Sequence, residues 1–187
     1  MATFASRSIE LKNRQAAVVR SAAPEDAAGV LEIGRAVLAE SPFVVMCPDE
    51  LPATVEEERE WIRTYAEAAG KLILTVEVGD ALVGILAFES GERRRIAHRG
   101  TLGMSVLKEW RDQGIGRALL EGLIHWGNEH PVLEKLCLSV FATNERAIAL
   151  YRKMGFVEEG RCPRAIKLSP GSYADELLMH RFVCETT

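Results

Sequence analysis

Residues 104–120, MSVLKEWRDQGIGRALL, contain the pattern that decides the fold of this chain. The pattern passes from a short apolar run, typical of a strand, through a loop with two glycines into an amphipathic helix. Gly114 and Gly116 have no side chains, so the backbone N–H groups of the loop are open to a phosphate-bearing ligand. The helix N-terminus adds partial positive charge, and Arg111 and Arg117 add full charges on either side. The segment therefore predicts a diphosphate-binding loop between a strand and a helix.

Other motifs with glycine, serine or histidine do not fit this sequence. A dinucleotide-binding G-x-G-x-x-G would need glycine where Leu119 stands, and no Walker G-K-[ST] is present. The run GMSVL at residues 103–107 begins like a nucleophile elbow, but Leu107 takes the place of the second glycine. His125 and His130 would lie roughly 140° apart around a helix, unlike a zinc-binding H-E-x-x-H pair. We therefore expect neither a serine hydrolase nor a metal site.

The sequence on both sides of the loop alternates between strand and helix patterns. A T-x-x-E capping box at residues 54–57 predicts a helix start, and Gly79-Asp80 predicts a two-residue hairpin turn. The patterns predict strands at 16–21, 72–78, 81–88, 97–106, 135–141, 156–160 and 176–183, and helices at 24–40, 54–70, 115–130 and 144–154. Three prolines between residues 41 and 53 predict an apolar loop. Meandering strands followed by β-α-β-α-β predict a mixed, mostly antiparallel central sheet with helices on both faces.

The composition is that of one ordinary domain. The chain has 187 residues and is 48% hydrophobic, so we expect a flexible tail at 1–15 and a single domain at 16–187. With 23 basic and 27 acidic residues the net charge is −4, which disfavours a nucleic-acid partner. No run approaches the roughly 18 apolar residues of a membrane span, and no signal peptide is evident. The four cysteines are widely spaced and are expected to be reduced thiols in a cytoplasmic protein: Cys47, Cys137, Cys162 and Cys184.

Two motifs in the right order resemble those of a known family. RDQGIG at 111–116 fits the [QR]-x-x-G-x-[GA] signature of GCN5-related N-acetyltransferases, and NERAIALYRKMGF at 144–156 looks like that family's N-x-x-A-x-x-L-Y-x-K-x-G-F segment. The similarity extends over 16–183 and is strongest over 101–156. The resemblance implies an acyl-CoA N-acyltransferase fold and an enzyme that moves the acetyl group of acetyl-CoA to an amine.

The resemblance also assigns roles to particular residues. It implies that the strand backbone at Met104, Ser105 and Val106 pairs with the pantetheine arm of coenzyme A. It places the diphosphate at a loop made of Arg111, Asp112, Gln113, Gly114, Ile115, Gly116 and Arg117. Asn144 would contact coenzyme A, and Tyr151 would contact it and return a proton to the leaving thiolate as general acid. Simpler readings stay open: Val106 in the core, Arg117 solvated, Asn144 as an N-cap and Tyr151 as a packed ring.

The implied reaction is direct attack by a neutral amine on the thioester, which requires a base for the ammonium proton. Glu89 and His98 are the candidates, because both are expected near the splayed centre of the sheet; delivery of the proton through water is the alternative. The acceptor site is expected between residues 40–52 and 163–175, whose acids suit a cationic amine. A small amine, an amino acid, an antibiotic amine or a protein N-terminus would all fit.

Two other functions remain open at the level of sequence. The chain could hold acetyl-CoA as a catalytically silent sensor, or it could dock a partner protein through the apolar loop at 44–46. The resemblance also implies a homodimer, which no sequence feature establishes.

Overall fold

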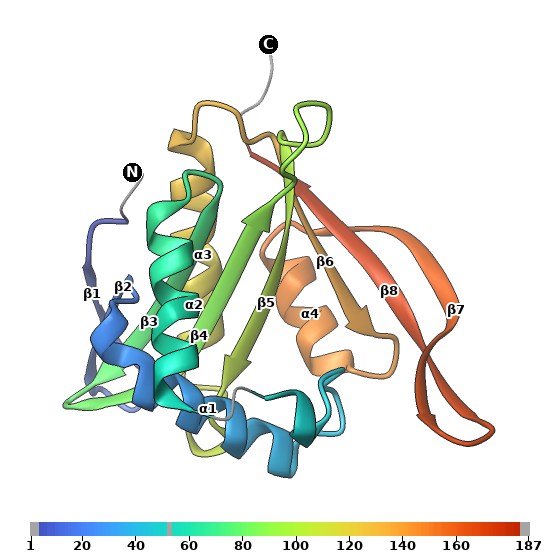
Figure 1. The fold of residues 1–187 in the computed structure, drawn as a ribbon, viewed down its shortest axis with the longest axis horizontal. Helices are drawn as coiled ribbons and strands as arrows, with labels where there is room; N and C mark the ends of the chain where they lie inside the picture. The colour runs from blue at the N-terminus through green and yellow to red at the C-terminus, as the bar shows by residue number, and fades with distance from the viewer. Residues whose placement is uncertain (1–3, 52–53, 184–187) are drawn as a thin grey trace.

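The computed structural model describes residues 4–51 and 54–183; Pro52, Ala53 and Cys184 lie outside this range. Its centre is a mixed sheet with the strand order β1-β2-β3-β4-β5-β6-β8-β7 (Figure 1). The strands are β1 (Arg7–Glu10), β2 (Ala16–Ser21), β3 (Lys71–Val78), β4 (Ala81–Ser90), β5 (Arg99–Val106), β6 (Lys135–Phe141), β7 (Val157–Ser169) and β8 (Ser172–Phe182). In this sheet β5 and β6 run parallel, and the other neighbouring strands run antiparallel.

Helices cover both faces of the sheet, as predicted. Figure 1 shows α1 (Ala27–Glu40) and α2 (Val55–Glu67) in front, with α3 (Ile115–Glu129) and α4 (Glu145–Lys153) behind. Short 3-10 turns precede α1, α2 and α3: η1 (Pro24–Asp26), η2 (Pro48–Glu50) and η3 (Lys108–Trp110). Within the described part of the chain, no helix combines the length and the apolar character that crossing a bilayer requires.

The alternation of side chains along β3 divides the core between the two faces. Leu72 and Leu74 belong to the large cluster with α3, whereas Ile73 packs with Ala27 and Ile62 on the side of α1 and α2. This is the period of two expected for a strand with apolar contacts on both faces. Residues of β4, β5 and β6 can therefore be assigned to one face or the other from the same alternation.

The start of α2 is the capping box predicted from the sequence. Thr54 Oγ1 accepts a hydrogen bond from Glu57 N at 3.2 Å, and the Glu57 carboxylate accepts one from Thr54 N at 3.0 Å. The helix ends at Glu67, three residues before the predicted end at Gly70.

The N-terminal segment differs from the prediction. The expected flexible tail at 1–15 is wrong for the described residues, because β1 pairs with β2 from Arg7↔Val19 to Glu10↔Ala16. Phe4 and Leu11 are 7% and 2% exposed. The strand itself, RSIE, is largely exposed and carries one partly buried apolar residue, so it has no alternation that sequence analysis could detect.

The last two strands are longer than predicted. We expected strands at 156–160 and 176–183, but β7 and β8 contain 13 and 11 residues and form a hairpin that projects beyond the rest of the sheet (Figure 1). Most β7 side chains are exposed, and the register shifts between Glu158 and Gly160 and again between Cys162 and Ile166. These bulges and the exposure explain why the hydrophobic pattern is weak there.

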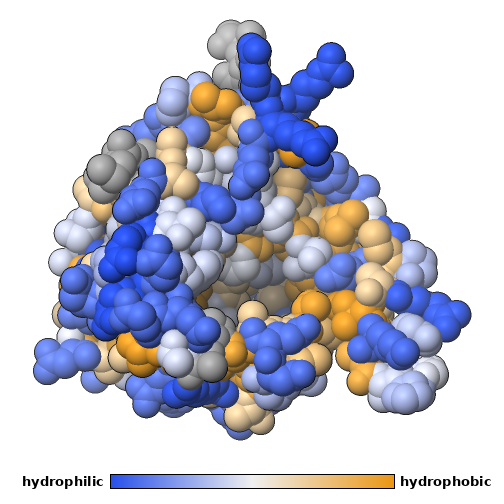
Figure 2. Space-filling model, in the orientation of Figure 1, coloured by the Kyte–Doolittle hydropathy of each residue, from blue (hydrophilic) through white to orange (hydrophobic). Residues whose placement is uncertain are grey.

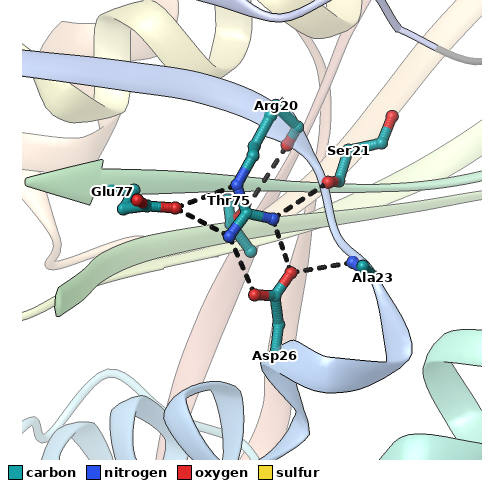
Figure 3. Close-up of polar contacts among 6 residues, drawn as sticks. All are labelled: Arg20, Ser21, Ala23, Asp26, Thr75 and Glu77. Carbon is teal, nitrogen blue, oxygen red and sulfur yellow. Dashed lines mark hydrogen bonds and ion pairs between the residues drawn. The ribbon is translucent and has the colours of Figure 1, made fainter. Parts of the chain in front are cut away.

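A polar network joins β2, β3 and the start of the first helix (Figure 3). The Arg20 guanidinium contacts Asp26 at 2.6 Å and Glu77 at 2.7 Å. Asp26 also accepts a hydrogen bond from Ala23 N at 2.7 Å. Burial alone would raise the pKa of Asp26, but the hydrogen bonds from Arg20 and Ala23 outweigh it and lower the pKa. The network therefore fixes the point at which the chain leaves the sheet.

Candidate active site

The central feature of the site is a wedge between the two parallel strands. β5 and β6 pair only over three residues, from Arg99↔Lys135 to Thr101↔Cys137, and then diverge (Figure 1). Beyond Thr101, β5 pairs only with β4, and beyond Cys137, β6 pairs only with β8. Each strand therefore presents one unpaired edge to the wedge, and its backbone groups are available to a ligand.

The hydrogen bonds to β4 decide which β5 residues point into the wedge. Leu107 N donates to Val83 O at 3.1 Å, and Gly91 N donates to Arg99 O at 2.9 Å. Because backbone groups alternate along a strand, these bonds direct the N–H and C=O groups of Met104 and Val106 into the wedge. Ser105 directs its backbone toward β4 instead. The expected main-chain contacts are therefore possible at Met104 and at Val106 N–H, whereas Val106 O already accepts a hydrogen bond from Arg111 Nε.

The phosphate loop follows directly after the open edge of β5. Its backbone is left-handed at Asp112 (φ 64°) and at Gly114 (φ 100°), which is the N-cap of α3. No side chain caps α3, so the N–H groups of its first turn lack an intrahelical partner. A Cβ at Gly114 would meet no atom within 4 Å. The loop thus has both the donors and the space that a diphosphate needs.

Gly116 has a different reason to be glycine. A Cβ there would lie 3.1 Å from Leu150 Cδ2 and 3.3 Å from Met104 Cε. The missing side chain allows α3 to pack closely against α4 and β5. The expectation that both glycines leave open space for a ligand therefore holds for Gly114 and not for Gly116.

The arginines beside the loop are engaged with acidic partners. Arg111 donates from Nε to Val106 O at 3.0 Å and forms an ion pair with Glu40 at the end of α1. Arg117 pairs with Glu121 at 2.7 Å, and its side chain is 70% exposed. Arg111 therefore links the mouth of the wedge to the front helices. Of the other loop residues, Asp112 pairs with Arg146 at 3.2 Å. Gln113 has a buried Oε1 without a hydrogen-bond partner among the described residues.

Asn144 and Tyr151 lie on α4, which Figure 1 shows in the gap between β5 and β6. Asn144 Oδ1 accepts a hydrogen bond from Ala147 N at 3.2 Å, so its N-cap role is confirmed. Tyr151 is 7% exposed, its ring centroid lies 5.9 Å from that of Phe156, and its hydroxyl has no hydrogen bond to any described residue. Burial raises the pKa of Tyr151 to about 12.

The two candidate bases are placed differently. Glu89 faces Thr101, the last residue of the parallel ladder, and so lies at the closed end of the wedge. It pairs with Lys71 at 2.9 Å and accepts a hydrogen bond from Tyr65 at 3.0 Å. The Lys71 contact, with a smaller contribution from Tyr65, lowers the pKa of Glu89. A paired carboxylate with a lowered pKa is a weaker base than an unpaired one.

His98 lies outside the wedge. It precedes β5, its carbonyl accepts hydrogen bonds from Glu134 N and Lys135 N, and it lines a surface pocket with Arg94 and His130. The eight residue steps from His98 to Val106 span roughly 26 Å along a strand. The expectation that His98 lies near the splayed centre is therefore not met, because the strands diverge only after Thr101.

The front face of the wedge is hollowed. Figure 2 shows a depression between the helices on the left and the hydrophobic surface of the last strands on the right. Thr101, Gly103 and Ser139 are exposed on this side, whereas the intervening Leu102 is buried. Phe43, from the loop after α1, contacts Phe141 at the end of β6 with ring centroids 5.7 Å apart.

The expected acid of the hairpin is already engaged. Asp175 pairs with Arg161 at 2.8 Å and accepts a hydrogen bond from Arg164 N at 2.7 Å. Arg164 in turn lies over the Tyr173 ring at 4.2 Å. These residues therefore stabilise the hairpin itself and leave Asp175 with little capacity for a substrate cation.

Sequence analysis missed one polar pair on the front face. Ser139 Oγ donates to Glu176 Oε1 at 3.0 Å, between β6 and β8. The two residues are 37 positions apart, and only the register of two long strands brings them together. No motif or spacing in the sequence would have indicated the contact.

A sheet that splits between two parallel strands, followed by an uncapped helix, defines the acyl-CoA N-acyltransferase class of fold. A model of the acetyltransferase (GNAT) family matches residues 38–156, and the chain belongs to this family. It is an N-acetyltransferase. Among the described residues, no group of three or more His, Cys, Asp or Glu side chains is arranged to hold a metal ion.

Individual relatives agree with this assignment. The chain is 29% identical over 121 residues to the L-amino acid N-acetyltransferase AaaT of Escherichia coli, covering 65% of this chain and 74% of the relative. A GNAT acetyltransferase from Streptococcus pneumoniae superposes with a TM-score of 0.85 at 28% identity, covering 90% of this chain and 99% of the other. The yncA acetyltransferase of Salmonella typhimurium, solved with acetyl-CoA, has a TM-score of 0.81 at 18% identity over 91% and 96% of the two chains, which supports the fold.

Proposed function

We propose that this acetyltransferase uses acetyl-CoA as co-substrate and acetylates a primary amine of a small molecule or of a protein N-terminus. One observation carries the proposal: the unpaired edge of β5 leads, through η3 and the glycine loop, to the uncapped N-terminus of α3. An extended amide-bearing arm suits the first element and a diphosphate suits the second. Acetyl-CoA contains both in one molecule, joined in this order.

The residues that would hold the co-substrate follow from the backbone. The N–H groups of Ile115, Gly116 and Arg117 would bind phosphate oxygens, because α3 has no side-chain cap. The main chain at Met104 and Val106 would pair with the pantetheine arm. An N–H group at this edge also suits the oxyanion that develops when an amine attacks the thioester directly.

Tyr151 would supply the proton that the leaving thiolate needs. With a pKa of about 12 its phenol is protonated at neutral pH and can act as a donor. The burial that raises the pKa of the phenol would also raise that of a thiol beside it, because both anions lose solvation. The proton transfer is then closer to balanced than the two reference pKa values suggest.

The acceptor is proposed to be cationic before it reacts. The similarity to an L-amino acid N-acetyltransferase supports an amino-acid or N-terminal amine. A cytoplasmic location and a homodimer belong to the same proposal. The location rests on the expected reduced cysteines, the dimer rests on the family resemblance, and light scattering on the purified protein tests the dimer.

Two measurements test the proposed function. Titration calorimetry should detect binding of acetyl-CoA, and a thiol-release screen should find an acceptor among polyamines, amino acids, aminoglycosides and N-terminal peptides. No heat of binding and no thiol release would contradict the proposal. Binding without thiol release from any amine would indicate a protein that binds acetyl-CoA without turning it over.

A further inference from the structure

We propose that Glu176, held by Ser139, binds the ammonium group of the acceptor on the front face of the wedge and takes its proton. This inference rests on the proposed function and assigns a base other than Glu89 and His98. It follows from three observations: the position of the pair beside the wedge, the charge of the face around it, and the capacity of the carboxylate.

The strand register places the pair on the front face of β6 and β8. Phe141 faces Glu176 and Ser139 faces Leu178 across the two strands, so Glu176 and Ser139 are diagonal neighbours on one face. The contact between Phe141 and Phe43 identifies that face as the side of the α1–α2 loop.

The same register brings the pair to the level of the open β5 edge. Thr101 and Cys137 form the last pair of the parallel ladder, and two residues further along are Gly103 and Ser139. Gly103 and Ser139 are both exposed, whereas Leu138, between Cys137 and Ser139 on β6, is buried in the core. Ser139 therefore lies just past the point of divergence. The β5 residues whose N–H groups point into the wedge follow from there.

Two other carboxylates on strands of this face have cationic partners. Glu89 pairs with Lys71 at 2.9 Å, and Glu159 pairs with Lys135 at 2.6 Å. Among residues 4–51 and 54–183, no cation forms an ion pair with Glu176. Among the described residues, its side chain has one hydrogen bond, which it accepts from the Ser139 hydroxyl. A substrate ammonium would supply the missing counter-charge.

The carboxylate has the capacity for this role while Ser139 holds it in place. An ionised carboxylate accepts about four hydrogen bonds, and the Ser139 hydroxyl uses one of them on Oε1. Oε2 and the remaining lone pair of Oε1 are left for an N–H donor. Ser139 thus acts as a positioning residue and Glu176 as the proton acceptor.

The proton transfer and the acyl transfer balance. Glu176 takes one proton from R–NH₃⁺, leaving the neutral amine. The nitrogen lone pair forms a C–N bond to the thioester carbonyl carbon, and the C–S bond breaks with its electrons on sulfur. The sulfur gains one proton and the amide nitrogen loses one. The sum converts an ammonium ion and an acetyl thioester into an N-acetyl amide, a thiol and one released proton.

Glu176→Gln and Ser139→Ala test the inference in the full chain, with the best amine from the thiol-release screen as probe. For Glu176→Gln we expect kcat/KM for the amine to fall about 10²-fold or more, with an unchanged acetyl-CoA dissociation constant by calorimetry. Ser139→Ala should cause a smaller loss of the same kind. A structural role alone would not confine the defect to the amine.

Glu158→Gln is the matched control. Glu158 lies on β7 and contacts Arg152 of α4, on the opposite face of the sheet, and its replacement removes the same charge. It should leave both substrates' parameters unchanged. Wild-type kcat/KM for the amine in Glu176→Gln would overturn the inference. Failure of the wild-type chain to bind acetyl-CoA, or to release thiol with any amine, would instead overturn the proposed function.

Discussion

Tyr151 combines a packed ring with a hydroxyl that has no described partner. The ring contributes to the core through Phe156, while the hydroxyl adds no internal hydrogen bond. Removing only the oxygen therefore separates packing from proton donation. This makes the residue suited to a conservative substitution.

Tyr151→Phe should lower kcat about 10² to 10⁴-fold if proton return to the thiolate limits the rate. Thermal stability should be nearly unchanged, because no internal hydrogen bond is lost. Steady-state kinetics and a melting curve measure the two effects. An unchanged kcat would remove the phenol from the mechanism and leave Tyr151 as a core residue.

Gly114→Ala tests the conformation of the phosphate loop. Alanine at φ 100° costs about 1–2 kcal/mol of folding free energy, and relief of this strain would turn the N–H groups away from a bound phosphate. We expect a lower Tm and a weaker acetyl-CoA dissociation constant by calorimetry. Gly160→Ala is the control, because a Cβ there meets no atom within 4 Å and its φ is not positive. Wild-type affinity in Gly114→Ala would argue against a diphosphate at this loop.

At the scale of elements, α2 depends on its first turn. Thr54→Ala removes the side-chain half of the capping box and should lower the unfolding free energy by about 1 kcal/mol. Thr64→Ala in the same helix removes a hydroxyl bonded to Glu60 O, an exposed back-bond that contributes little. Denaturant unfolding of both variants gives the comparison. Equal losses would show that the cap contributes no more than any exposed threonine.

The elements differ in how well their sequences predict them. β3 begins one residue before its predicted start, and β6 has its predicted bounds, because buried apolar side chains mark both strands clearly. The sequence did not predict β1 or the outer part of the β7–β8 hairpin, because their side chains are mostly exposed. In the hairpin, bulges also interrupt the alternation. The order of the strands is set by contacts far apart in the chain, which local patterns do not encode.

The residues of the candidate site also differ in how far the sequence predicts them. The glycine loop and the α4 segment are contiguous motifs, so their residues could be named from the sequence, although their roles stay predictions. The pairing of Glu89 with Lys71 and the contact of Ser139 with Glu176 depend on strand register. They become visible only when the sheet is assembled.

For the whole molecule, the Arg20–Asp26–Glu77 network should make stability depend on pH. The folded-state pKa of Asp26 lies below its ordinary value, so its contribution is present above the unfolded pKa, near 3.8. It is lost as the pH falls through the folded-state pKa. Denaturant unfolding from pH 7 to pH 3 should show a falling free energy in the acid range.

Asp26→Asn should be less stable than the wild type at pH 7 and should lose less stability on acidification. Glu25→Gln is the control, because Glu25 forms no ion pair with the described residues. It should reproduce the wild-type acid dependence. A wild-type slope in Asp26→Asn would assign the acid sensitivity to other carboxylates.

The contacts of the residues on either side of β1 have a practical consequence for producing a shortened form of this enzyme. The family match begins at residue 38, yet Phe4 packs beside Gly122 of α3, and Lys12 N donates to Gln113 O at 3.2 Å. A chain that begins at the match boundary would lack β1, β2 and most of α1, and with them the backbone contact from Lys12 to the phosphate loop. Fragments that begin at residue 38 should therefore be unstable and should bind acetyl-CoA more weakly.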